Sequence, residues 1–289
     1  MTKLSGACVC ALLLASACVP PPEVTTTPSH FPTNTVMGQI QQAGVLRIAV
    51  PNDRPIFSDF QKGLGDYVAK ALHVEPQFVP APNDELLQMI DSGTADMAFP
   101  ASATTEQMAR HYAVTDPYFI AHQRVAVPAN SSITQLAQFS GHTVCAAVDP
   151  ETEVDPSTMA GLTVTTSDPA GCGRALARHG VDAVTAADTS LIALVGEQIK
   201  GCSATCSVKI AGDQLTTEGY GAIASNKATG LGEVLSNILE RAQADGTWTT
   251  LYRRFILPRE PDVDPDSEPP TMTAEEAAAL YPQDATVAP

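Results

Sequence analysis

The chain has 289 residues, which is enough for one large domain or two smaller lobes, and its formal net charge is -16 at pH 7. That charge argues against nucleic-acid binding, because phosphate groups are held by Lys and Arg, and it leaves no basic patch for anionic lipid. The hydrophobic content of 44% and the mean hydropathy of +0.01 are typical of a soluble globular protein. We interpret the acidic excess chiefly as a contribution to solubility.

The first 17 residues have the pattern of a signal peptide. Lys3 precedes a short apolar run, residues 7–15, which is too short to span a bilayer as a helix, and small residues follow it. The segment LASAC, which ends at Cys18, resembles a bacterial lipobox, although Ala15 stands where Leu is usual. We therefore expect lipidation at Cys18 and a place on the extracytoplasmic face of the cell membrane, with simple secretion as the alternative.

Two further segments have the composition of disordered chain. Residues 18–35 are rich in Pro and Thr, and they are predicted to tether the folded part to the membrane. Residues 258–289 are acidic and rich in Pro, and they are predicted to form a mostly disordered tail.

Between these segments, hydrophobic periodicity predicts strands that alternate with helices, and therefore a parallel α/β sheet. The expected elements of the first part are a helix over 36–43, a strand over 45–50, a loop over 51–57, a helix over 66–72, a strand over 74–79 and a helix capped by Asn83. The later ones are a strand ending at Cys145, a helix over 190–195, strands over 208–211 and 219–224, and a helix over 231–239.

Four cysteines remain once those of the signal peptide and the lipid site are set aside. An even number in an exported chain predicts disulfides, and four cysteines allow three connectivities. Cys202 and Cys206 have the spacing of a local clip, and Cys145 would then bridge to Cys172. A zinc site is disfavoured, because paired CxxC motifs are missing and His is scarce, so we expect no metal and no cofactor.

The segment VTDPYF over 114–119 and the segment ADGTWTTLYRRF over 244–255 resemble signatures of the bacterial extracellular solute-binding proteins of family 3. These are amino-acid receptors of ABC importers, and the resemblance, to the glutamine/glutamate-binding type, covers about 36–257. It implies an α/β, two-lobed, periplasmic-binding-protein-like type II fold with a mixed, mostly parallel sheet in each lobe and two hinge crossings. Residues 36–124 and 214–257 would form lobe 1, and residues 125–213 lobe 2.

The same resemblance places a ligand site in lobe 1, where this chain departs from the family. The family arginine that clamps the ligand's α-carboxylate falls on Met108, and the family Thr falls on Ala103, with Thr104 and Thr105 close by. Arg110 lies two residues after Met108. A shift of two residues turns a helical side chain by about 200°, so we expect Arg110 to be a solvated surface charge.

Lobe 2 departs from the family as well. The loop that would hold the carboxylate is DPET over 149–152, whose two acids and proline are unfavourable for an anion. The family Asp that binds the ammonium falls on Ala187, so the next residue, Asp188, either faces the ligand or caps a helix. Phe57 either packs on the ligand or lies in the core. The candidate ligand-binding residues are Phe57, Thr104, Thr105, Met108, Thr152 and Asp188.

Three functions are open at this stage. The favoured one is a solute-binding lipoprotein that hands a ligand to an ABC permease, as a monomer and without nucleic acid. Its ligand would be an amino acid or derivative other than an ordinary free α-amino acid, either cationic, given the acids, or less polar, given Met108. The second is a sensory or partner-binding lipoprotein that retains the fold. An enzyme is disfavoured, because no nucleophile elbow, HExxH motif or Ser-His-Asp set can be argued, and no catalytic residue is expected.

Overall fold

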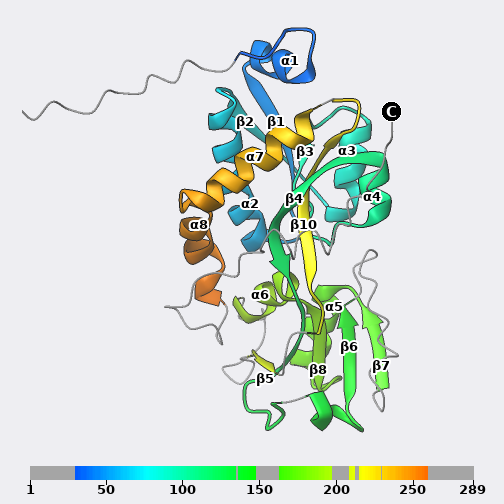
Figure 1. Ribbon diagram of the computed structural model, residues 1–289. Coiled ribbons are helices and arrows are strands. Elements are labelled where there is room, and N and C mark those ends of the chain that lie inside the picture. Colours follow the sequence, from blue (N-terminus) through cyan, green and yellow to red (C-terminus); the bar gives the residue numbers. More distant parts are fainter. Residues whose placement is uncertain are drawn as a thin grey trace, which may run out of the picture.

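The computed structural model describes residues 30–134, 136–147, 163–196, 208–211, 215–228 and 230–259, which form two lobes (Figure 1). The expected signal peptide, Cys18, Thr152, the pair Cys202 and Cys206, and the tail beyond residue 259 lie outside these ranges. The last six residues of the expected tether lie inside them. There the Phe31 N–H donates to Oε1 of Gln41 at 3.0 Å, so this end of the segment packs against the first helix.

Lobe 1 is built on a five-stranded sheet with the order β2-β1-β3-β10-β4. β1 is parallel to β2 and β3, whereas β10 is antiparallel to β3 and β4. The strands are β1 (Val45–Pro51), β2 (Glu75–Ala81), β3 (Met97–Ala98), β4 (Tyr112–Ala121) and β10 (Glu218–Ser225). The helices are α1 (Val36–Ala43), α2 (Pro55–Ala71), η1 (Asn83–Glu85), α3 (Leu86–Asp91), α4 (Glu106–His111), α7 (Leu231–Ala244), α8 (Thr247–Phe255) and η5 (Leu257–Arg259).

Lobe 2 repeats this plan with a second five-stranded sheet, in the order β7-β6-β8-β5-β9. β6 is parallel to β7 and β8, and β5 is antiparallel to β8 and β9. The elements are β5 (Gln123–Pro128), η2 (Leu136–Phe139), β6 (Thr143–Ala147), β7 (Thr163–Ser167), α5 (Pro169–Ala177), β8 (Ala183–Ala187), α6 (Asp188–Gly196) and β9 (Val208–Ala211). Two mixed, mostly parallel sheets confirm the fold class that the sequence predicts.

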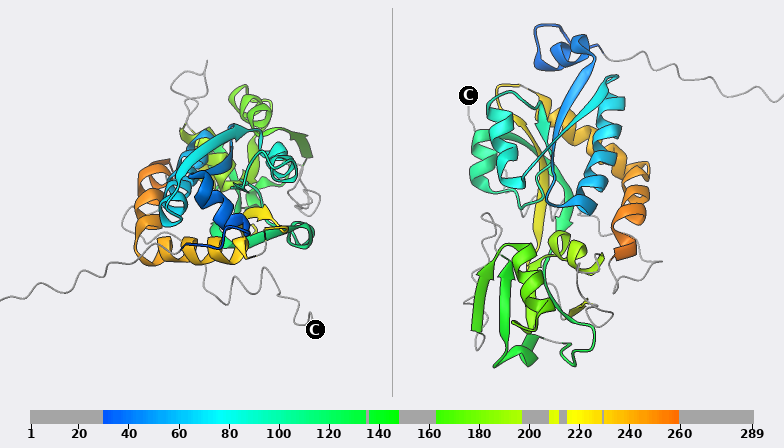
Figure 2. Two further views of the ribbon diagram at one scale, coloured as in Figure 1. Left: turned by 90° about the horizontal axis from the view of Figure 1, so that it is seen from above. Right: turned by 180° about the vertical axis from the view of Figure 1, so that it is seen from behind.

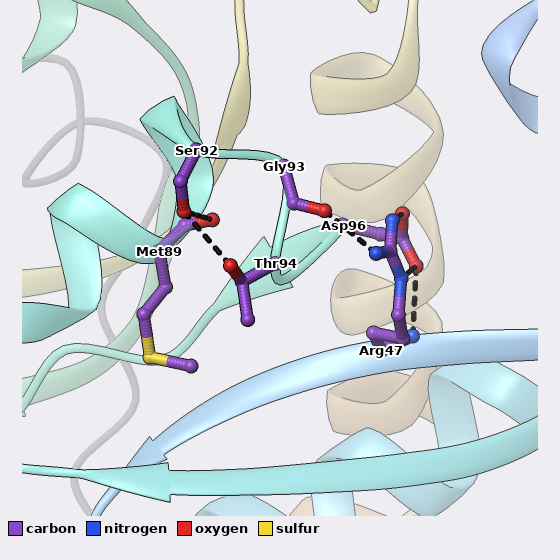
Figure 3. Close-up of polar contacts among 6 residues, drawn as sticks. All are labelled: Arg47, Met89, Ser92, Gly93, Thr94 and Asp96. Atoms are coloured by element: carbon purple, nitrogen blue, oxygen red, sulfur yellow. Dashed lines mark hydrogen bonds and ion pairs between the residues drawn. The ribbon is translucent and has the colours of Figure 1, made fainter.

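The start of β3 is fixed by an ion pair that reaches across the sheet to β1. Asp96 accepts hydrogen bonds from the backbone N–H of Arg47 at 2.8 Å and from Nε of the same residue at 3.1 Å. Figure 3 shows the guanidinium between this carboxylate and the carbonyl of Gly93, which accepts from Nη1 at 2.6 Å. The loop that ends α3 is therefore held in register with the sheet, and β3 delivers the following loop to a defined place.

One prediction was wrong here, because the chain after β1 is helical much earlier than expected. α2 begins at Pro55 and runs for 17 residues, so Phe57 lies in a helix and not in the expected loop 51–57. Proline is favoured in the first turn of a helix, where its missing N–H needs no partner. Phe57, Phe60, Leu64 and Val68 then form a buried stripe with helical spacing, each at most 1% exposed.

The centre of lobe 1 is an aromatic cluster that joins α2 to the sheet and to α8. The Phe57 ring lies 4.8 Å from Phe119 and 5.9 Å from Tyr220, measured between ring centroids. Trp248 stacks on Tyr252 at 5.1 Å and donates through Nε1 to the Tyr118 carbonyl at 2.7 Å. The cluster therefore anchors the second crossing strand, which carries Tyr220, in the core of lobe 1.

Two segments of chain connect the lobes, and they lie side by side, as Figures 1 and 2 show. The first passes through His122, between β4 and β5, and the second passes through Thr216, just before β10. Nδ1 of His122 donates to the Thr216 carbonyl at 2.8 Å, and the Gln123 N–H donates to Oγ1 of Thr216 at 3.0 Å. These bonds tie the two crossings together where a hinge of this kind must bend.

A disulfide joins Cys145 on β6 to Cys172 on α5, with the Cα atoms 5.5 Å apart. Both residues are at most 3% exposed, and the bridge is the pairing that the sequence favours. Within the described ranges, no helix is both long enough and apolar enough to cross a membrane.

Candidate functional site at the lobe boundary

The candidate site lies where the carboxyl ends of the parallel strands of one lobe meet those of the other. In α/β sheets, ligands bind beyond the carboxyl ends of the strands. In lobe 1 the ends of β1 and β2 are in register, and the Asn52 N–H donates to the Ala81 carbonyl at 2.9 Å. The loops that follow carry Arg54 and Asn83. In lobe 2, α6 begins directly after β8, so its first turn lies at the corresponding edge.

The two edges meet through Arg54 and Ser190. Arg54 precedes α2 in lobe 1, and its Nε donates to Oγ of Ser190, in the first turn of α6, at 3.1 Å. Nη1 of Arg54 also donates to Oδ2 of Asp53 at 3.0 Å. Arg54 is only 7% exposed, so a cationic group is buried between the lobes. Residue order gives no hint that positions 54 and 190 meet, and this contact is the main feature that the sequence interpretation missed.

Two more residues of α6 contact lobe 1. Oγ1 of Thr189 shares a hydrogen bond of 3.2 Å with the hydroxyl of Tyr220. Ile192, 3% exposed, belongs to the hydrophobic cluster of lobe 1 although its helix belongs to lobe 2. The neighbouring Leu191 packs in the cluster of its own lobe. The first two turns of α6 therefore connect the two cores, which Figure 1 shows as a helix at the junction.

Asp188 is the first residue of α6 and lies beside the first crossing. Its Oδ1 accepts from the N–H of Thr189 at 2.7 Å, and its Oδ2 accepts from the N–H of His122 at 3.1 Å. The Asp188 N–H in turn donates to the His122 carbonyl at 2.8 Å. The carboxylate thus lies at the lobe boundary and binds backbone groups at the start of α6, in agreement with the helix-start alternative, while a contact with ligand stays a prediction.

The loop between β3 and α4 is held by two buried amide side chains. Nε2 of Gln61 donates to the carbonyl of Phe99 at 2.9 Å and to the hydroxyl of Tyr118 at 2.7 Å. Oδ1 of Asn83 accepts from the N–H of Ala101 at 2.7 Å, so Asn83 fixes this loop. The sequence predicted that Asn83 would cap a helix, and that prediction was wrong. Since these partners set the orientation of both amides, the atoms left without a partner are Oε1 of Gln61 and Nδ2 of Asn83.

The other lobe 1 candidates surround the same loop. Oγ1 of Thr104 accepts from the Gly221 N–H at 2.9 Å, which ties the loop to the second crossing strand. Thr105 caps α4 by accepting from the Met108 N–H at 3.1 Å, and the Met108 side chain is buried at 8% exposure. The Arg110 side chain is 69% exposed and lies 3.6 Å from Glu106, so it is a surface charge, as the sequence predicts.

The two remaining candidates are Phe57, which the structure describes, and Thr152, which it does not. Phe57 is 1% exposed inside the aromatic cluster, which is the core position that the sequence left open as one alternative. The Phe57 ring packs against the ring of Tyr220, whose hydroxyl bonds Thr189 of α6. Phe57 therefore stabilises the position of Tyr220 at the boundary without lying at the boundary itself. Thr152 lies outside the described residues. Because ligands of α/β sheets bind beyond the carboxyl ends of the strands, the sequence could have drawn attention to Arg54 and Asn83. Their partners, however, depend on the tertiary fold.

Burial shifts the titration of two groups at this boundary. It lowers the pKa of His122 from the ordinary value of 6.5, an effect that the charge of Arg124 reinforces and that the bond to the Thr216 carbonyl partly opposes. Complete burial raises the pKa of Tyr220 far above its usual value, with the charge of Glu218 adding to the shift. Both side chains are therefore neutral near pH 7, and Arg54 is the buried cation among the described boundary residues.

Two α/β lobes, two adjacent crossings and buried polar groups between the lobes define a hinged, two-lobed binding protein of the type II periplasmic class. Residues 59–258 match the family model of the bacterial extracellular solute-binding proteins, family 3, and the chain belongs to that family.

Solved structures of similar proteins agree with this assignment. An ancestral arginine-binding protein bound to glutamine is 26% identical with a TM-score of 0.59, covering 74% of this chain and 98% of its own. A mutant of ArgBP from T. maritima is 22% identical with a TM-score of 0.61, covering 76% and 99%. An ancestral amino-acid-binding protein, described as a precursor of cyclohexadienyl dehydratase, is 19% identical with a TM-score of 0.61, covering 76% and 98%. The comparison with curated proteins returned no match.

Proposed function

We propose that this protein is the extracytoplasmic solute receptor of an ABC importer, anchored to the cell membrane through a lipid on Cys18. The observation that carries the proposal is the contact of Arg54 with Ser190, which buries a charged group between two lobes connected by a hinge. A receptor that closes around a small solute needs such polar groups at the facing sheet edges. Membership of family 3 and the similarity to amino-acid-binding proteins support the same function.

We further propose that the ligand is an amino-acid derivative or other small solute, and not an ordinary free α-amino acid. The chain resembles the glutamine/glutamate-binding type, but the apolar Met108 stands where the family clamps the α-carboxylate. In addition, the Asp188 carboxylate, expected to bind the ligand's ammonium, already binds two backbone N–H groups. The pair of opposite charges that a zwitterion requires is therefore altered on both sides.

Thermal-shift titration with Glu, Asp and Gln tests this ligand assignment. We expect no stabilisation at millimolar concentration. A Kd near 1 μM would contribute about 4 kcal/mol at 1 mM ligand, which such a titration detects easily. A clear response at micromolar concentration would refute the altered specificity, while leaving the receptor function in place.

The alternative function is a sensory or partner-binding lipoprotein that retains the fold. The altered ligand positions, such as Met108, and the acidic tail over 260–289 favour it. Affinity capture with the membrane-extracted protein distinguishes the two functions, because a receptor should retain permease subunits.

Deleting residues 260–289 tests whether the acidic tail recruits a different partner, and unchanged partners would argue against the alternative. Mass spectrometry of the extracted protein tests acylation of Cys18.

We expect no catalysis. The family and the similar structures are mainly binding proteins, and the boundary residues described above show no nucleophile paired with a base.

A further inference from the structure

Arg54 has an unusual combination of charge, burial and place. A buried guanidinium is costly unless anionic or hydrogen-bonding groups surround it, so its position at 7% exposure requires partners of that kind. It belongs to the loop after β1, at the sheet edge where ligands of such folds bind. It also reaches the first turn of α6 in the other lobe, so its surroundings change when the lobes open or close.

One acidic neighbour of Arg54, Asp53, is bound in a way that permits exchange. Asp53 is adjacent in sequence, and its Oδ2 accepts from Nη1 of Arg54 at 3.0 Å. Its side chain is 42% exposed, whereas that of Arg54 is 7% exposed. A carboxylate that is this accessible can move into water at little cost, and exposed ion pairs contribute little to stability. Asp53 therefore marks a position that another carboxylate can take.

Two further donors lie at the facing edges, Ser190 in lobe 2 and Asn83 in lobe 1. Oγ of Ser190 accepts from Nε of Arg54, which leaves its own hydroxyl hydrogen to donate to a bound anion. Nδ2 of Asn83 is buried without a partner, and Asn83 leaves β2 beside the loop that carries Arg54, since Pro51 pairs with Ala81. An unsatisfied buried donor is expected to have a partner in the functional state. A guanidinium, a hydroxyl and an amide N–H together suit a carboxylate.

We propose that Arg54 binds the carboxylate of a small organic acid, with Ser190 and Asn83 as additional donors and with Asp53 displaced. The site thereby keeps a carboxylate-binding cation, but on the β1–α2 loop instead of at the family position, which is Met108. This inference rests on the proposed receptor function and names its ligand class. It also explains how a chain without the family arginine can stabilise an anion between its lobes.

The test compares carboxylates with their uncharged primary amides, which have nearly the same shape. Glutarate, butyrate and hydrocinnamate are titrated by calorimetry against glutaramide, butyramide and hydrocinnamamide, with agmatine as a cationic probe. The expected result is that at least one acid binds at least about tenfold more tightly than its amide. Arg54→Gln should weaken binding of that acid by about 10- to 100-fold and leave binding of the amide unchanged.

Two matched variants separate ligand binding from a merely structural role of Arg54. Asp53→Asn removes one carboxylate that competes for Arg54 and should tighten binding of the acid by about two- to fivefold. Arg54→Lys keeps the charge but loses the planar fork, so it should recover only part of the preference for acid over amide. If Arg54 only held the lobes together, its loss would weaken acid and amide equally, and Asp53→Asn would not tighten binding.

The proposal is overturned if no acid binds, if acid and amide bind equally to the unmodified protein, or if Arg54→Gln retains the preference. Binding of agmatine without any acid would overturn it in favour of a cationic ligand, and the receptor function would still stand. Failure of the receptor function is a separate result, shown by the absence of permease subunits in the affinity capture described above.

Discussion

At the scale of single residues, Gly221 shows how closely the second crossing strand approaches its neighbours. A Cβ atom at this position would lie 2.8 Å from the Thr115 carbonyl oxygen, 2.8 Å from Cγ1 of Val114 and 3.1 Å from Oγ1 of Thr104. We predict that Gly221→Ala lowers the free energy of unfolding by about 1–3 kcal/mol, because backbone atoms here have no room to move. Urea denaturation measures this. Gly180→Ala is the control, since its Cβ would have only ordinary contacts.

His122 lies at the first crossing between the lobes, and its titration should make the stability of the protein depend on pH. Its folded pKa lies below 6.5 because burial disfavours the imidazolium, so folding releases a proton in this range. The contribution of His122 to stability is therefore complete above pH 6.5 and is lost progressively as the pH falls toward the folded pKa. The charged groups near it are Asp188, Glu218 and Arg124.

We predict that His122→Asn reduces the loss of stability between pH 6.5 and pH 5, because Asn can donate to the Thr216 carbonyl without titrating. Thermal unfolding across that range measures the effect, and His111→Asn, at an exposed position on α4, should leave the pH profile as it was. Parallel pH profiles for the original protein and the His122 variant would show that this residue does not contribute.

At the scale of elements, α2 explains why its first half was missed in the sequence. Two glycines interrupt the helix, and glycines usually weaken one. In the structure, a Cβ at Gly65 would meet the Phe78 ring at 2.7 Å, and a Cβ at Gly63 would meet Leu251 of α8 at 2.4 Å. Both glycines allow close packing of α2 against its neighbours, so tertiary contacts compensate for a poor local helix propensity.

The disulfide ties β6 to α5, and it should matter for lobe 2 alone. It closes a loop of 27 residues, for which chain entropy predicts a stabilisation of about 3.5 kcal/mol. We predict that replacing Cys145 and Cys172 by Ser lowers the stability of lobe 2 by up to that amount. Hydrogen exchange should become faster in β6 and α5 and remain slow in β1 of lobe 1. Uniform acceleration in both lobes would contradict this assignment.

At the scale of the whole molecule, α6 controls how the two lobes meet. Ile192 of α6 belongs to the lobe 1 cluster, whereas Leu176 on α5 belongs to the core of lobe 2. We predict that Ile192→Ser shifts the molecule toward an open arrangement and raises its radius of gyration, because buried apolar contact between the lobes is lost. Small-angle X-ray scattering measures this change.

The matched control for that experiment is Leu176→Ala, which should reduce stability by about 2–5 kcal/mol without opening the lobes. Identical scattering from the original protein and the Ile192 variant would show that α6 does not hold the lobes together.

The sequence by itself determined the class of fold and most elements, and it favoured the pairing of Cys145 with Cys172 that the structure shows. These depend on local signals: the helical spacing over 36–43 ends at Gly44 as predicted, and the motif ADGTWTTLYRRF falls on the end of α7 and on α8. Hydrophobic periodicity and turn residues act over a few positions, so they can be interpreted without knowing the distant chain.

Only the tertiary structure decided the character of the boundary between the lobes. Arg54 and Ser190 are separated by 136 positions, and neither has a local pattern that indicates its partner. Likewise, Phe57 is a core residue because α2 begins at Pro55. Asn83 was predicted to cap a helix, but in the structure it binds the Ala101 N–H and holds that loop. Burial and pairing of polar groups depend on which strand ends the fold brings together, and that arrangement is a property of the whole chain.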